Sequence, residues 1–96
     1  MGSMTTESLA RDLKGFLEGR VAADDSEFVS ATGAFNAGEY EPAIAALSVF
    51  AAERRLALPA QLMQSLAEFA GRSDIDDGDA LDVNESLETL HATGAA

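Results

Sequence analysis

The sequence contains no cysteine and no tryptophan, and only one histidine, His91. Without cysteine the chain has no disulfide, no thiolate metal ligand and no cysteine nucleophile. A single histidine also excludes a metal site built on a histidine pair. No apolar run approaches the roughly 18 residues that span a bilayer, and the N-terminus lacks the basic and then apolar pattern of a signal peptide. These absences predict a cytoplasmic protein.

Basic residues are also scarce. The 96 residues include 17 acidic and six basic side chains, which gives a formal net charge of −11. Positions 1–72 hold ten acidic and six basic side chains, whereas positions 73–96 hold seven acidic and none basic. Such a chain repels nucleic acid and anionic membranes and attracts basic protein surfaces. Acidity would also keep an alanine-rich protein in solution, and both interpretations stay open.

The apolar residues recur at helical spacing along most of the chain, which predicts an all-α fold and a small four-helix bundle. Pro42 suits the first turn of a helix, and Pro59 suits the start of the next one. A short connection joins these two helices, so we expect them to pack as an antiparallel hairpin. The expected helices lie near residues 5–18, 25–37, 40–54 and 59–70.

The composition divides the chain at residue 72. Residues 1–72 are expected to form the bundle, with 1–3 as an expression scar before a natural start at Met4. The acidic stretch that begins at Ser73 is predicted to be a mobile linker. Beyond it we expect a weak fifth helix near 82–91, opened by Asp82 and Glu85 as a capping box and carrying a narrow apolar stripe, Val83, Leu87 and Leu90. That helix either docks on the bundle or waits for a partner, and residues 92–96 are expected to be disordered.

No motif indicates an enzyme. A Gly-x-Ser-x-Gly elbow is absent, and the acidic run from Asp74 to Asp82 does not fit a calcium loop, because Gly78 falls where a ligand is required. We therefore expect no enzyme activity, no cofactor and no metal. Carboxylates at the start of the helix near residue 40 are explained by the helix dipole without any reaction.

The residues expected to bind a partner are acidic, apart from one tyrosine. Tyr40 either packs its ring within the fold or acts as a rigid anchor surrounded by acid. The carboxylates would pair with arginine and lysine of a basic protein. The predicted partner-binding residues are Glu39, Tyr40, Glu41, Asp74, Asp76, Asp77 and Asp79.

Two family resemblances add to this interpretation. Residues 34–44, Ala-Phe-Asn-Ala-Gly-Glu-Tyr-Glu-Pro-Ala-Ile, resemble the turn between the two helices of a tetratricopeptide repeat, and one such unit is visible. Residues 13–25, Leu-Lys-Gly-Phe-Leu-Glu-Gly-Arg-Val-Ala-Ala-Asp-Asp, resemble the opening helix and turn of small colicin-type immunity proteins. The stretch 38–69 is similar to helical immunity proteins of bacterial polymorphic toxin systems. The immunity resemblance implies an acidic helical protein that binds a cationic toxin at or beside its active site.

Together these observations predict an acidic protein-binding module, an immunity-type antagonist of a basic bacterial toxin. The partner would be a basic protein, with no nucleic acid and no membrane, and the oligomeric state is left open. The alternative is a non-enzymatic regulatory or scaffolding adaptor with a tetratricopeptide-like helical hairpin. In the adaptor, the stripe of the tail helix would insert into a groove of another protein.

Overall fold

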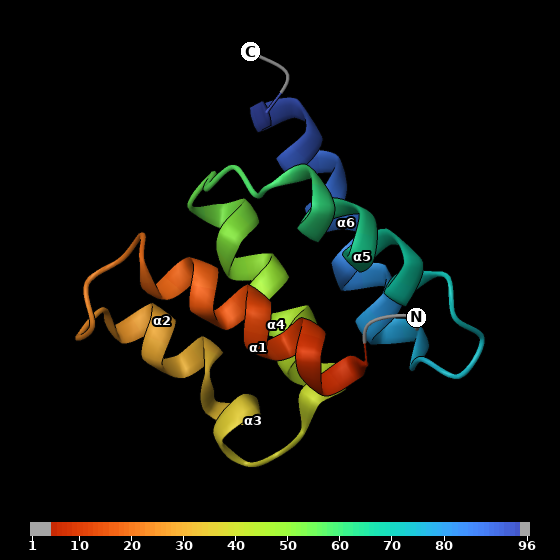
Figure 1. Cartoon of the computed structure of the whole chain (residues 1–96), viewed down its shortest axis with the longest axis horizontal. Coiled ribbons are helices and arrows are strands. Elements are labelled where there is room, and N and C mark those ends of the chain that lie inside the picture. Colours follow the sequence, from red (N-terminus) through yellow and green to blue (C-terminus); the bar gives the residue numbers. More distant parts are fainter. Residues whose placement is uncertain (1–4, 95–96) are drawn as a thin grey trace.

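The computed structural model of the chain describes residues 5–94 and confirms the all-α prediction. The expected scar at 1–3 lies outside the described residues. None of the helices in this part of the chain is long and apolar enough to cross a membrane. The described residues form six helices, whose order along the chain can be followed in Figure 1: α1 Thr6–Glu18, α2 Ser26–Ala31, α3 Gly33–Asn36, α4 Tyr40–Glu53, α5 Ala60–Ala70 and α6 Asp77–Gly94.

The first helix forms where its sequence predicts. The Thr5 hydroxyl caps α1 by accepting the backbone N–H of Ser8 at 3.0 Å. Such a cap satisfies one of the amide groups that a helix leaves unpaired at its start. The apolar face of α1 packs into the core through Leu9, Leu13 and Leu17.

A single helix over residues 25–37 was a wrong prediction, because the segment forms two short helices, α2 and α3. Asp25 caps α2 by accepting the N–H groups of Glu27 and Phe28, each at 3.1 Å. The break falls at Thr32, whose hydroxyl donates to the carbonyl of Val29 at 2.8 Å. Such back-bonding competes with regular helix geometry, and Gly33 follows directly with a low helix propensity.

Helix α4 lies at the centre of the molecule and packs against α1, α2, α3 and α6 (Figure 1). Its buried residues surround most of the helix: Ala43, Ile44, Ala45, Leu47, Ser48, Phe50 and Ala51. Its most extensive contact is with α6. Small side chains such as Ala45 and Ser48 allow a neighbouring helix to approach closely, so the alanine-rich sequence accounts for the central position of α4.

The expected antiparallel hairpin of α4 and α5 is not the packing that forms. Helix α5 packs against α6 and α1 and scarcely touches α4. The chain leaves α4 through Arg55, which adopts a left-handed φ of 53°, and the N–H of Leu56 bonds back to the carbonyl of Ala51 at 2.9 Å. This turn directs the connection away from α4, and α6 fills the space beside α4 instead.

The C-terminal segment also differs from its prediction. Helix α6 begins at Asp77 instead of residue 82 and runs to Gly94, so the prediction of a short helix at 82–91 was wrong in length. The prediction of disorder was also wrong for residues 92–94, which belong to α6. Asp76 accepts the N–H groups of Gly78 at 3.0 Å and Asp79 at 3.4 Å, so Asp82 and Glu85 are not a capping box. Residues 95 and 96 lie outside the described part.

Helix α6 belongs to the core instead of extending from it. Its predicted stripe is buried, with Val83 0%, Leu87 6% and Leu90 2% exposed. Ile75, in the turn before α6, is 6% exposed and anchors the acidic stretch that was predicted to be a mobile linker. Hydrophobic residues on both sides of position 72 therefore share one core.

Candidate protein-binding surface

Two of the predicted partner-binding residues lie around Arg72. The carboxylate of Asp74 accepts two hydrogen bonds from this guanidinium, at 3.0 Å from Nε and 2.7 Å from Nη2. These bonds hold the pKa of Asp74 below its usual value and raise the pKa of Arg72. The nearby negative charge of Glu41 also raises the pKa of Arg72. The fold thus brings Glu41 and Asp74 near one base that already compensates their charge.

A second group of predicted residues forms the start of α6. Asp76 is occupied in capping the helix, and Asp77 is exposed in its first turn. Burial raises the pKa of Asp79 above its usual value, and the charges of Asp76 and Asp82 raise it further. These carboxylates therefore lie close together, and Asp82, further along α6, lies near Asp79.

The remaining two predicted residues lie at the start of α4. Glu39 is exposed and precedes the first helical turn. Tyr40 is half-buried, and its ring meets that of Phe35 edge to face, with 5.5 Å between the ring centres. The contact with Phe35 shows that the ring packs within the fold, as in the first of the two interpretations of Tyr40.

A groove between α2, α4 and α6, here called the acidic groove, brings together residues that the sequence did not single out as a site. Its volume is about 540 Å³, within the usual range of binding pockets. A smaller hollow of about 160 Å³ shares several of its residues and extends it along α6 to Glu85. The acidic groove has an apolar floor, Ala31, Ala46, Val49 and Phe50, and acidic walls, Glu27, Glu53, Asp82 and Glu85.

The charge on the walls is uneven. On the α2 side, Arg54 pairs with Asp25 at 2.8 Å and with Glu27 at 2.7 Å, and its guanidinium lies 4.8 Å from the centre of the Phe50 ring. Within residues 5–94, no lysine or arginine lies within salt-bridge distance of Glu53, Asp82 or Glu85. The α6 side therefore holds the uncompensated negative charge.

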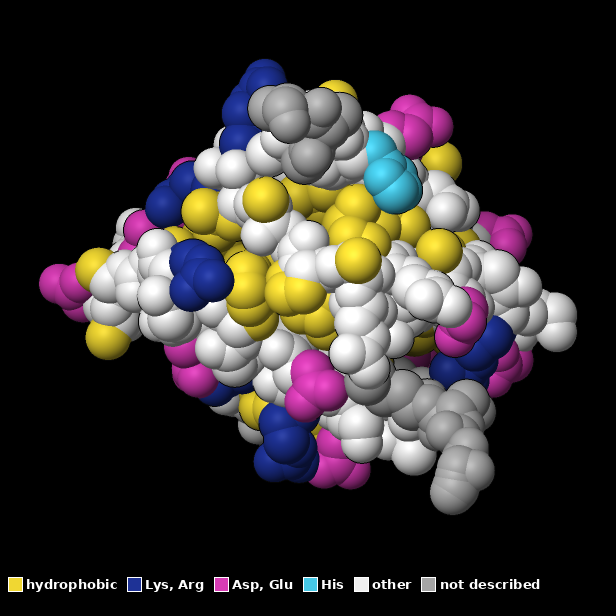
Figure 2. Space-filling model, turned by 45° about the horizontal axis from the view of Figure 1, so that its top comes forward, with side chains coloured by type: hydrophobic (Ala, Val, Ile, Leu, Met, Phe, Trp, Pro, Cys, Tyr) yellow, Lys and Arg dark blue, Asp and Glu magenta, His cyan; other side chains and the backbone are white. Residues whose placement is uncertain are grey.

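A second groove, here called the uncharged groove, lies between α5, α6 and the connection that precedes α5. Its volume is about 550 Å³. Figure 2 shows it as a band of hydrophobic side chains with the cyan histidine, His91, at its edge and no acidic side chain within it. Its main residues are Ala57, Leu58, Met63, Ala67, Leu90 and His91.

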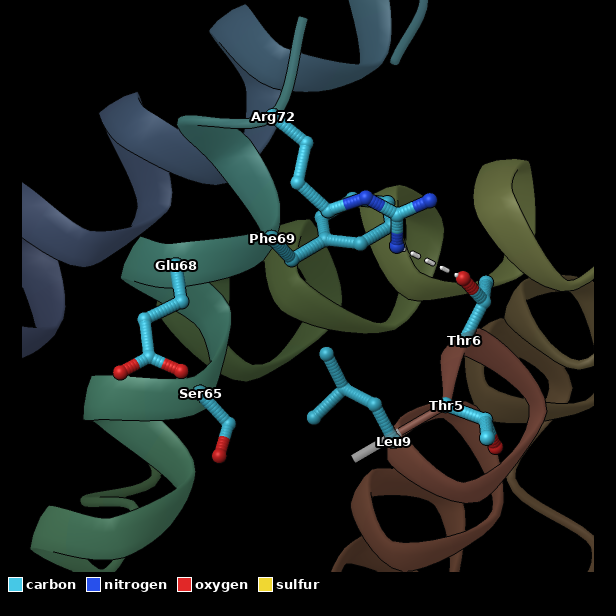
Figure 3. Close-up of a pocket in the computed structure, with 7 residues that line it drawn as sticks. All are labelled: Thr5, Thr6, Leu9, Ser65, Glu68, Phe69 and Arg72. Carbon is cyan, nitrogen blue, oxygen red and sulfur yellow. Dashed lines mark hydrogen bonds between the residues drawn. The ribbon is translucent and has the colours of Figure 1, made fainter. Parts of the chain in front are cut away.

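Another hollow, of about 260 Å³, lies between α1 and α5. Figure 3 shows Arg72 above the ring of Phe69, reaching across the hollow to Thr6, to which it donates a hydrogen bond of 2.9 Å. Because Asp74 already binds the same guanidinium, Arg72 is not a free anion ligand. Arg72 has a structural role in this hollow, because it links Thr6 of α1 to Asp74 in the turn before α6.

The sequence does not reveal the walls of the acidic groove, because Asp82 and Glu85 have the spacing of a capping box at a helix start. In the structure they lie inside α6, one helical turn apart on the side facing α4. Their spacing of three residues is the signal that could have placed them on one face. In the described part of the chain, no three His, Asp or Glu side chains are grouped so that they could hold a metal ion.

Comparison with known proteins returns no protein-family model, no curated protein and no solved structure that matches the chain. The resemblances to immunity proteins and to a tetratricopeptide turn therefore stay predictions.

Proposed function

We propose that this chain is a non-enzymatic protein-binding module that engages a basic protein through the acidic groove. The observation that carries the proposal is the convergence of Glu53, Asp82 and Glu85 beside an apolar floor, where none of the three has a lysine or arginine within salt-bridge distance in residues 5–94. Carboxylates held together in this way repel one another, and a cationic surface would relieve that repulsion. The apolar floor adds contact area that charge alone does not supply.

The proposed role is that of an immunity-type antagonist of a basic bacterial toxin, acting in the cytoplasm. The net charge of −11 would accelerate encounter with a cationic protein at low salt. Binding at or beside the active site of the toxin would then block access to its substrate. Asp82 lines the acidic groove and lies near Asp79 at the start of α6. The predicted residues Asp76, Asp77 and Asp79 would therefore extend the contact with the toxin beyond the groove.

Capture from a lysate of the native cells tests the proposal. The bait would be wild type, the groove variant Asp82→Asn/Glu85→Gln, and the control variant Asp12→Asn/Asp24→Asn. Both variants remove two exposed carboxylates and the same net charge, so they separate the groove from the overall charge. We expect one basic protein to bind wild type and the control at low salt, and to be lost from the groove variant and at high salt.

A growth assay then distinguishes an antagonist from other binding proteins. Expression of the captured protein in a bacterial host should arrest growth, and co-expression of this chain should restore it. The proposal is wrong if no basic protein is captured, or if the control variant loses the partner to the same degree as the groove variant. A captured protein that leaves growth unaffected would reject the antagonist role alone.

The uncharged groove favours the alternative, a regulatory or scaffolding adaptor. Its aliphatic side chains and the flexible Met63 suit a neutral partner. The stripe once expected to insert into a partner is buried in the core, so the adaptor would have to use this groove instead. Retention of a neutral partner at high salt, and its loss in Met63→Gln, would support the adaptor.

A further inference from the structure

The acidic groove has a shape and a charge distribution that define which segment of a partner it fits. It runs between helices, and the described residues contain no β-strand. An extended peptide would therefore find no sheet edge for its backbone N–H and C=O groups. A helix satisfies its own backbone hydrogen bonds and needs only a side-chain surface to pack on.

The floor of the groove suits such a helix. Ala46 and Val49 on α4, with Ala31 on α2, are half-buried and partly accessible. Small side chains let a docking helix approach closely, and positions 46 to 53 of α4 span about 10 Å, or two helical turns. That length accommodates two or three apolar anchors spaced three or four residues apart on the incoming helix.

The walls give the incoming helix an orientation. On the α6 side Asp82 and Glu85 have no basic partner within the described chain, whereas on the α2 side Glu27 is paired with Arg54 and its neighbours are serines, Ser26 and Ser30. Charge complementarity therefore calls for lysine or arginine on one flank of the helix and small polar residues on the other.

We propose that the acidic groove receives an amphipathic helix of the partner. The apolar stripe of that helix would pack on the floor of the groove, and its basic residues would face α6. The inference rests on the proposed function, whose partner it specifies further. It predicts that binding depends on the helical arrangement of the apolar and basic residues, and not only on their number.

Two synthetic peptides of identical composition test this. One 15-residue peptide places leucine at helical spacing with lysine on one flank and serine on the other. The second permutes the same residues so that leucine and lysine alternate as in a strand. Fluorescence anisotropy of labelled peptides, at low and high salt, measures the affinity of each. We expect the helical peptide to bind at least about tenfold more tightly, and to weaken at high salt.

Variants of the protein locate the site. Ala46→Gln fills the floor of the acidic groove without changing charge, and Ala67→Gln makes the same change in the uncharged groove. We expect Ala46→Gln to weaken the helical peptide about tenfold, and Ala67→Gln to have little effect. Circular dichroism confirms that both variants keep the wild-type helix content. Asp82→Asn/Glu85→Gln should reduce both the affinity and its salt dependence, whereas Asp12→Asn/Asp24→Asn should not.

The proposal is overturned if neither peptide binds at low salt, if both bind equally, or if Ala46→Gln leaves the helical peptide unaffected. These outcomes differ from a failure of the proposed function. A basic protein that is still captured from lysate, and still lost from the Asp82 and Glu85 variant, would keep the protein-binding role while rejecting the docked helix.

Discussion

The acidic groove and the uncharged groove have almost the same volume, about 540 and 550 Å³, but different chemistry. Carboxylates without a salt-bridge partner in the described residues line the α6 wall of the acidic groove, whereas the uncharged groove is lined by aliphatic side chains with His91 at its edge. Helix α6 contributes to both. Because the volumes are nearly equal and the charges are not, the two grooves would favour different kinds of partner, and salt should distinguish the two kinds of binding.

The largest expected effect concerns α6 itself, on which both grooves depend. Leu90→Ala should destabilise the fold by about 2 to 5 kcal/mol, because Leu90 is 2% exposed and its truncation leaves a cavity. Leu81→Ala on the same helix should change stability by less than about 0.5 kcal/mol, because Leu81 is 56% exposed. Urea denaturation followed by circular dichroism measures both. Equal small effects would show that α6 does not pack in solution as described.

An intermediate effect is expected at the link between α2 and α4. Arg54→Gln should raise the pKa of Asp25 only part of the way to its usual value, because the N–H of Phe28 is the largest cause of the lowering and remains. It should also leave Glu27 unpaired and so increase the affinity of the acidic groove for the basic helical peptide severalfold. Carboxyl NMR titration and anisotropy measure the two effects.

The matched control for this prediction is Arg72→Gln, which removes another arginine that pairs with an aspartate. It should raise the pKa of Asp74 without changing that of Asp25 or the affinity of the acidic groove. In the wild-type protein, the lowered pKa of Asp25 stabilises the fold at pH values above about 3.9, the ordinary pKa of an aspartate. This stabilisation is lost as the pH falls through the lower pKa that Asp25 has in the folded state. A basic peptide that binds Arg54→Gln less tightly would contradict the assigned site.

The smallest expected effect lies at the start of α6. The raised pKa of Asp79 means that folding favours its protonated form, so its contribution to stability is highest below about pH 3.9 and is lost as pH rises through the folded-state value. Asp79→Asn should therefore stabilise the protein at pH 7 by less than about 0.5 kcal/mol and not at pH 3. Thermal unfolding at both pH values measures this.

Asp77→Asn provides the control, because Asp77 is exposed in the same helical turn and favourably placed toward the helix dipole. It should give no gain at pH 7. A gain from Asp77→Asn as large as that from Asp79→Asn would attribute the effect to overall charge instead of to the neighbours of Asp79.

Local signals in the sequence predicted most helix positions, whereas the packing of helices depended on contacts that those signals do not contain. The positions of α1 and α5 and their apolar faces followed from the helical spacing of the apolar residues. The sequence around Asp76 predicts a mobile linker, because its charge outweighs one apolar residue, Ile75, which the fold buries. Once α6 is packed on α4, Asp82 and Glu85 face the groove, and that placement could not be derived from composition.

The most direct test of the central claim, that the acidic groove is the partner-binding site, is to titrate the ¹⁵N-labelled protein with the basic helical peptide and follow the amide NMR signals. We expect the largest shifts at Ala31, Ala46 and Val49, and their loss at high salt. Shifts concentrated instead at Met63, Ala67 and His91, and retained at high salt, would contradict it.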